Sequence, residues 1–293
     1  MTDGIKKKFI LAGKGIEHVV RDLKKRLFMG TALKTLPGSY RFRFLMALFT
    51  LRNVRKQRHV IQKIIQYKKA LNYPQNNIAF VFNCFLSLSY DMLFPHLLVE
   101  NPQKYLQYVS IEGEEYVRRL LEQDTGVILI SGHFGPKFRA ILFKEALGIN
   151  TPSFIGPAYR DKIANSSSKL YKTLSLYKYY IVGEEKPLQE GLRKKEWIVF
   201  LNDYPVKKRE SNHQTMFGKR VYFSELPFKI SLEQNIPLLF FGTTRIKHKY
   251  QISILPLDNF QTKQEGLEKY VALVEGLLHR DPYAGFFTAE HHF

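Results

Sequence analysis

The sequence predicts an α/β protein with a mostly parallel sheet flanked by helices, preceded by a helical N-terminal region. Two patterns predict this fold class. From residue 126 onward, short aliphatic and β-branched runs alternate with longer helical stretches, as in repeated β-α-β units. Before that point, apolar residues recur at a period near 3.6 with cations between them, as in surface helices. With 45% hydrophobic and 14% aromatic residues, the chain can form a packed core.

The N-terminal region is expected to be built from helices. Apolar periodicity indicates a helix over 56–71, which ends at the turn-forming run 72–77. A second helix is expected from about 78 to 93, because Pro95 disfavours its continuation. Further short helices are expected over 103–109 and 114–123.

The apolar stretch 78–99 approaches the length of a membrane span. It is interrupted by Asn83, Asp91, Pro95 and His96, which favours a buried or interfacial pair of helices over a membrane span. Arginines likewise break the shorter apolar stretch 41–51. No secretory signal is recognised at the N-terminus. The protein is therefore predicted to be cytoplasmic and at most peripheral to the inner face of the membrane.

Strands and helices alternate after residue 126. Strands are expected over 127–130, 153–155, 179–182, 198–201, 238–243 and 251–254. Intervening helices are expected over 136–147, 166–176, 186–194 and 228–235. The predicted organisation is a basic helical region over 1–110 packed on an α/β body over 111–293, together forming one structural domain.

The first candidate site residue is His133, which follows the strand 127–130 almost at once. Pro136 stands where the first turn of a helix tolerates proline. His133 is thus placed at the carboxyl end of a central strand, where open α/β sheets bind their ligands. A nearby helix N-terminus disfavours the imidazolium and keeps the ring available as a base. The alternative is a histidine that merely ends a strand.

Four segments of the chain resemble one known family. The block from Gly126 to Gly135 reads Gly-Val-Ile-Leu-Ile-Ser-Gly-His-Phe-Gly, and Leu-Asn-Asp-Tyr at 201–204, Phe-Gly-Lys-Arg at 217–220 and Asn-Ile-Pro-Leu at 235–238 follow in order. Together they are similar to the signature blocks of the lysophospholipid acyltransferase superfamily, closest to the late acyltransferases of bacterial lipid A biosynthesis.

This resemblance implies a glycerol-phosphate acyltransferase-like fold. It also implies transfer of a fatty acyl group from an acyl-carrier protein or acyl-CoA thioester to a hydroxyl or amine acceptor, with no cofactor. His133 would act as the general base, and backbone N–H groups near Gly135 would hold the oxyanion.

One position departs from the family signature, which is His-x-x-x-x-Asp/Glu. Counting from His133, the carboxylate would stand at position 138, where this chain has Phe138. In relatives the acid orients the imidazole and stabilises its charge. Three explanations are open: another group supplies the carboxylate, the acceptor needs less assistance from a base, or the acyl-transfer chemistry is lost.

Asp203 is one candidate for the missing carboxylate. It follows the apolar strand that ends at Leu201, so it is expected at the same edge of the sheet as His133. In the resembling family an acidic residue of this block lies near the active site, and we assign Asp203 to substrate binding there. The alternative is that Asp203 caps the following loop.

Cations in two loops are candidates for binding a phosphate of the donor or of a phospholipid. Gly218 permits a tight turn, and Lys219 and Arg220 follow it, with Lys219 in place of the family's arginine. Arg160 is a further candidate for anion contact. The alternatives are a solvated hairpin tip for 218–220 and a surface loop for Arg160.

Charge is concentrated at the N-terminus, where residues 1–70 hold 18 Lys or Arg against three acids and carry 15 of the 19 net positive charges. Such an arm suggests an anionic partner: an anionic membrane surface first, nucleic acid second and an acidic acyl-carrier protein third. No nucleic-acid-binding module accompanies the charge, so nucleic acid is not expected. Plain solubilising charge is the remaining alternative.

The single cysteine, Cys84, excludes an intrachain disulfide framework, and no ligand spacing indicates a metal site. The adjacent pair His291 and His292 is interpreted either as an accident of the chain end or as a contact, not as a metal site. The sequence thus favours a membrane-peripheral acyltransferase. The alternative is a catalytically degenerate relative that binds lipid or acyl carrier without turnover.

Overall fold

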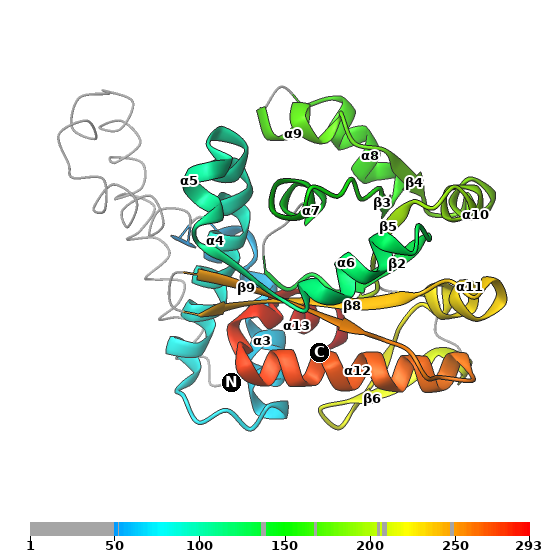
Figure 1. Cartoon of the computed structure of the whole chain (residues 1–293). Coiled ribbons are helices and arrows are strands. Elements are labelled where there is room, and N and C mark those ends of the chain that lie inside the picture. The colour runs from blue at the N-terminus through cyan, green and yellow to red at the C-terminus, as the bar shows by residue number, and fades with distance from the viewer. Residues whose placement is uncertain are drawn as a thin grey trace.

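The computed structural model describes residues 50–51, 53–135, 139–166, 169–203, 206, 210–246 and 249–293 (Figure 1). Residues 1–49 of the basic arm and the helix start at Pro136 therefore lie outside the described residues, as does Phe138. Within the described part, the predicted α/β sheet flanked by helices is confirmed.

Seven strands form one sheet in the order β1-β9-β8-β2-β5-β3-β4. They are β1 (Val109–Glu112), β2 (Val127–Ser131), β3 (Ser153–Ile155), β4 (Tyr179–Ile181), β5 (Trp197–Leu201), β8 (Leu238–Ile246) and β9 (Lys249–Pro256). The five strands from β8 to β4 run parallel, whereas β9 pairs antiparallel with β8 and β1 pairs parallel with β9. All six predicted strands are present. β1 was not predicted, because a helix was expected over 103–109 and the strand has no buried apolar run.

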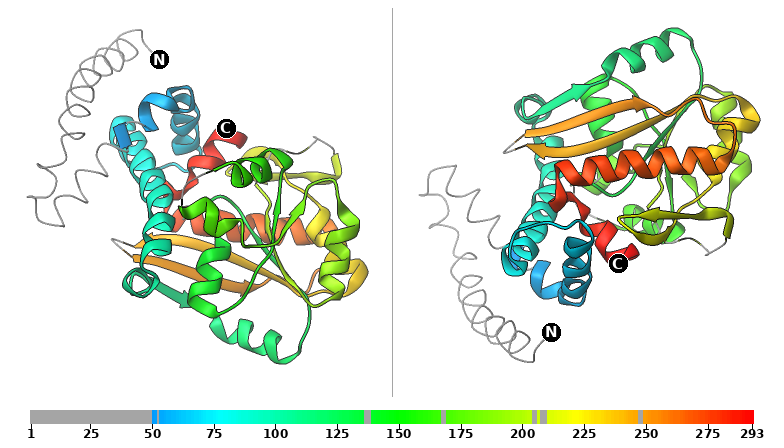
Figure 2. Two further views of the ribbon diagram at one scale, coloured as in Figure 1. Left: turned by 90° about the horizontal axis from the view of Figure 1, so that it is seen from above. Right: turned by 90° about the horizontal axis from the view of Figure 1, so that it is seen from below.

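Helices cover both faces of the sheet (Figures 1 and 2). One face carries α6 (Glu114–Glu122), α7 (Arg139–Leu147), α8 (Pro157–Ala164) and α9 (Lys169–Leu174). The other carries α3 (Ile61–Ala70), α10 (Glu185–Arg193), α11 (Leu226–Gln234), α12 (Lys263–Arg280) and α13 (Phe286–His292), with the hairpin of β6 (His213–Met216) and β7 (Lys219–Tyr222).

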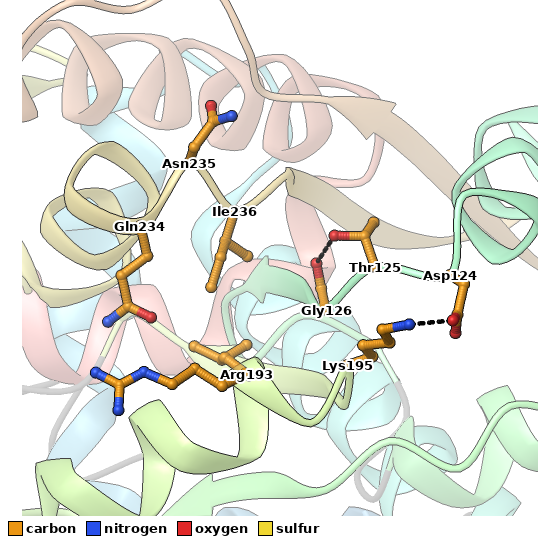
Figure 3. A pocket seen from close by; sticks show the side chains of 9 residues that line it. Asp124, Thr125, Gly126, Arg193, Lys195, Gln234, Asn235 and Ile236 are labelled. Atoms are coloured by element: carbon orange, nitrogen blue, oxygen red, sulfur yellow. Dashed lines mark hydrogen bonds and ion pairs between the residues drawn. The ribbon is translucent and has the colours of Figure 1, made fainter.

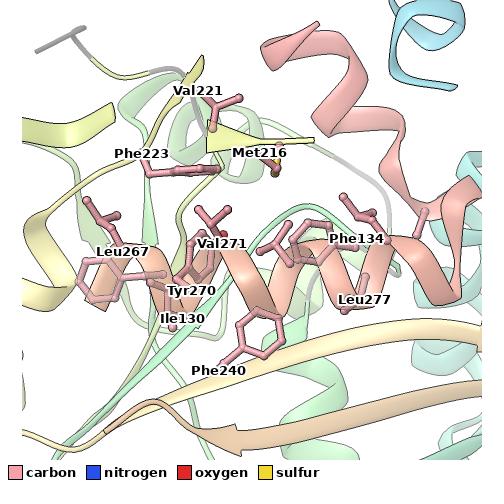
Figure 4. Packing of buried hydrophobic residues seen from close by; sticks show 14 of the residues in the cluster. Ile130, Phe134, Met216, Val221, Phe223, Phe240, Leu267, Tyr270, Val271 and Leu277 are labelled. Atoms are coloured by element: carbon pink, nitrogen blue, oxygen red, sulfur yellow. The ribbon is translucent and has the colours of Figure 1, made fainter. Parts of the chain in front are cut away.

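Successive residues of β2 point to opposite faces, so Ile130 enters one core and Leu129 the other. Figure 4 shows the first of these cores around Ile130, Phe134 and Tyr270.

The helix α4 (Asn77–Glu100) corrects the predicted end before Pro95. It runs as one helix through that proline instead of forming a helix pair. Phe94 and Leu98 on either side of the proline are buried in one core, while Phe80 and Phe85 are buried in the other. Burial along the whole helix outweighs the backbone hydrogen bond that proline cannot donate. Among the described residues it is the one helix long and apolar enough to cross a bilayer, and 59% of its most apolar window is buried inside the fold.

The remaining differences from the expected elements are local. The helix expected over 56–71 is formed by the 3-10 helix η1 (Arg58–Val60) followed by α3. The helix expected over 103–109 ends early as α5 (Pro102–Leu106), before the chain enters β1. Residues after Gly156, expected as a loop, form α8, which begins with Pro157 at its first position. The helices α12 and α13 were not predicted.

The connections out of β2 and β5 leave in opposite directions. β2 leads through α7 to β3, which lies beyond β5, whereas β5 leads through the hairpin and α11 to β8, which lies beyond β2. α7 and α11 accordingly lie on opposite faces of the sheet. A crevice is therefore expected outside the carboxyl ends of β2 and β5, the position at which open α/β sheets bind ligands.

Candidate functional site

His133 and Asp203 meet at the carboxyl ends of β2 and β5. Ser131 and Leu201, the last residues of β2 and β5, are paired in register, and each candidate side chain stands two residues further on. The His133 Nδ1 atom lies 2.6 Å from Asp203 Oδ1. The backbone N–H of His133 also donates to Asp203 Oδ2, at 2.5 Å. One carboxylate thus holds both the ring and the backbone of the histidine.

The backbone around this pair is tightly packed. Asn202 donates its backbone N–H to the Ser131 carbonyl at 2.7 Å, which ties the two strand ends together. The same carbonyl accepts the Tyr270 hydroxyl of α12 at 3.1 Å. A Cβ at Gly132 would stand 2.2 Å from the Phe134 ring and 2.9 Å from Asp203 Oδ2, so only glycine fits there.

The Asp203 carboxylate is the most buried charge of the site, with its side chain 3% exposed. Burial alone raises the pKa of Asp203, but the His133 ring and the two hydrogen bonds from His133 outweigh that effect and lower it, with a contribution from His292. The carboxylate is therefore ionised at neutral pH and accepts from Nδ1. In the neutral ring this fixes the proton on Nδ1, so that Nε2 is the basic nitrogen.

Aromatic and histidine side chains of α13 cover the pair. The Phe287 ring lies parallel to the His133 ring, with centroids 4.4 Å apart and an interplanar angle of 18°. The His133 side chain is 12% exposed. Burial lowers the pKa of both His291 and His292, although the Asp203 carboxylate opposes this shift. Both imidazoles are therefore neutral at neutral pH.

Gly135 lies beside this pair, at a φ of +75° and against Thr243 of β8. A Cβ at Gly135 would stand 2.7 Å from the Thr243 Cβ, and the left-handed φ independently favours glycine. The turn after His133 is thereby held against the neighbouring strand.

Among the described residues, the hydrogen bonds that join His133 to Asp203 do not involve Gly218, Lys219, Arg220 or Arg160. Gly218 lies at the tip of the β6–β7 hairpin, and the side chains of Lys219 and Arg220 are exposed. Arg220 lies over the Tyr222 ring, 5.7 Å from its centroid. Arg160 stands in α8, not in a loop, and pairs with its neighbour Asp161 at 3.1 Å.

A surface pocket lies at the opposite edge of the sheet (Figure 3). Gly126, Lys195 and Ile236, which line it, precede β2, β5 and β8, so the pocket is at the amino ends of these strands. Neither His133 nor Asp203 lines it. It is therefore distinct from the candidate site.

No group of three or more His, Cys, Asp or Glu residues in the described part of the chain is arranged to hold a metal ion. Cys84 is buried and has a pKa raised by burial, which makes its thiol unreactive at neutral pH.

The sequence predicted that His133, Gly135 and Asp203 lie at the same edge of the sheet. It did not identify Phe287 as part of the site. The run at 291–293 was the only signal from this segment, and it gives no sign that a helix folds back over β2. Comparison with protein-family models found none that matches the chain, and comparison with curated proteins likewise found no match. The resemblance to acyltransferases therefore depends on the motif residues themselves.

Proposed function

We propose that this protein is an acyltransferase with a glycerol-phosphate acyltransferase-like fold, in which His133 is the general base and Asp203 orients it. The observation that carries the proposal is the bond between His133 Nδ1 and Asp203 Oδ1, 2.6 Å long. It supports the first of the three explanations for Phe138, that a carboxylate from another strand replaces the motif acid. The role of Asp203 is then to position His133, in place of the substrate binding expected for it.

The reaction would proceed by attack of a hydroxyl or amine acceptor on the carbonyl of a fatty acyl thioester. His133 Nε2 takes the proton of the attacking group as the new bond to carbon forms. The ionised Asp203 stabilises the imidazolium so produced. When the tetrahedral intermediate collapses, the carbon–sulfur bond breaks and the proton passes from His133 to the departing thiolate. Backbone N–H groups near Gly135 would hold the oxyanion.

The donor would be acyl-CoA or an acyl-carrier protein. Lys219 and Arg220 are exposed and are proposed to contact a phosphate of the donor or of a lipid acceptor. Between residues 23 and 90 the chain has no Asp or Glu, which favours an anionic surface as its neighbour. We place the protein in the cytoplasm, peripheral to the inner face of the membrane.

The cover over His133 favours a second candidate function. With Phe287 parallel to its ring and the side chain only 12% exposed, His133 is compatible with a degenerate relative that binds lipid or acyl carrier without turnover. In such a protein the pair would serve folding alone.

An acyl-transfer assay separates the two candidates. The full chain would be incubated with acyl-CoA or acyl-carrier protein and a panel of hydroxyl and amine acceptors, and products would be detected by mass spectrometry. We expect transfer by the wild type and its loss in His133→Ala. Binding of acyl carrier or vesicles without transfer by the wild type would instead support the degenerate relative.

A further inference from the structure

The helix α13 brings residues far along the chain to the His133–Asp203 pair. Phe287 stacks on the His133 ring, 4.4 Å away between centroids. Five residues further along the same helix lies His292, whose pKa is lowered by burial and raised by the nearby Asp203 carboxylate. The helix therefore stacks a ring on His133 and places a second imidazole near Asp203.

Independent contacts fix α13 in this place, beside α3 (Figure 2). Lys63 of α3 donates to the Glu290 carbonyl, and the Phe286 ring packs against Phe85 of α4 at 5.2 Å. At the start of the helix, a Cβ on Gly285 would stand 2.2 Å from the Tyr67 hydroxyl, so the backbone lies directly against α3. The position of Phe287 is thus set by packing remote from His133.

The stack restricts the motion that the hydrogen bonds leave open. Asp203 fixes Nδ1 and the backbone N–H of His133, but the imidazole can still tilt about the Nδ1–Oδ1 direction. A ring lying 18° from parallel against one face prevents a tilt toward that side. The direction in which Nε2 points is therefore determined by Phe287 as well as by Asp203.

We propose that Phe287 is a positioning residue for acyl transfer, which holds the His133 imidazole in the plane that aims Nε2 at the acceptor. This inference rests on the proposed function for its catalytic consequence. The contact between Phe287 and His133 can itself be tested without any measurement of activity.

The experiment compares Phe287→Leu with Phe286→Leu in the full chain. Both changes remove a ring from neighbouring positions of α13, but only the first removes a ring that contacts His133. Phe287→Tyr keeps the stacking ring and serves as the conservative rescue. Thermal unfolding first establishes that all three variants are folded.

Two quantities are then measured. The rate at which diethyl pyrocarbonate modifies His133, followed by peptide mass spectrometry, reports how well the imidazole is covered. We expect it to rise at least threefold in Phe287→Leu and to stay at the wild-type value in Phe286→Leu and Phe287→Tyr. In the transfer assay, kcat should fall about three- to tenfold in Phe287→Leu with KM unchanged, the range expected for losing one aromatic stack.

The outcomes separate this inference from the proposed function. An unchanged modification rate in Phe287→Leu, or an equal rise in Phe286→Leu, overturns the positioning role. A selective rise in the modification rate with unchanged kcat also overturns it. If the wild type transfers no acyl group, the proposed function fails, and with it the catalytic role of Phe287, whereas a selective rise in modification still verifies the contact.

Discussion

Replacing Gly132 by alanine tests how closely the residues around His133 and Asp203 are packed. A Cβ at this position would stand 2.2 Å from one Phe134 ring carbon and 2.6 Å from another, where ordinary contacts are 3.4–4 Å. The Phe134 ring would have to move by more than 1 Å, yet it is fully buried. Overpacking of this kind costs about 1–3 kcal/mol of the free energy of unfolding. The same Cβ would lie too close to Asp203 Oδ2. The substitution is therefore also expected to weaken the hydrogen bond from the His133 backbone N–H to this oxygen.

Urea unfolding monitored by fluorescence measures this cost. The only tryptophan, Trp197, is buried in β5 and pairs with Val127 of β2, so its emission reports the strands that carry the site. Gly276→Ala is the control, because its Cβ would meet nothing within 4 Å and alanine suits the middle of α12. We expect the control to stabilise the protein by about 0.5–1 kcal/mol. A Gly132→Ala variant as stable as the wild type would refute the packing described around His133.

Two further predictions concern charge. Because the pKa of Asp203 is lowered in the folded chain, its ionised form stabilises folding above about pH 4, and this contribution is lost as pH falls through the folded-state pKa. Stability should therefore fall more steeply between pH 5 and 3 in the wild type than in Asp203→Asn, and parallel curves from urea titrations would contradict this. Binding to anionic vesicles should weaken in the Lys56→Glu/Arg58→Glu double variant and as salt rises, since the Debye length shortens to about 8 Å at physiological ionic strength. In co-sedimentation, Lys186→Glu on α10 should bind as the wild type does, and equal binding to neutral and anionic vesicles at low salt would rule out the electrostatic attraction.

The sequence predicted the parts of this site that depend on local pattern. β2 was recognisable from its aliphatic run, and the rule that ligands bind at strand ends placed His133 and Asp203 at one edge. Their hydrogen bonds depend on the pairing of Ser131 with Leu201, which joins strands 70 residues apart in the chain. No local pattern encodes that register.

Long-range packing decided the features that were missed. α4 continues through Pro95 because both cores bury it, which local propensity alone does not predict. Phe287 contacts His133 because α12 and α13 return across the sheet, a path determined by contacts with α3 and α4. The side chains of Lys219 and Arg220 are exposed on the hairpin, and their part in phosphate binding stays a prediction.

In the proposed mechanism, Asp203 orients the His133 imidazole in place of the carboxylate that is missing at position 138. The most direct test of this role is kcat for acyl transfer in Asp203→Asn, which keeps the shape of the side chain but removes the charge that accepts from Nδ1. In serine proteases, loss of the carboxylate that orients the catalytic histidine costs about ten-thousand-fold in kcat, so we expect a fall of at least about a thousandfold here, with the fold intact. Asp161→Asn, an exposed carboxylate on α8, should leave kcat unchanged. A fall of less than about fivefold in Asp203→Asn would contradict the account.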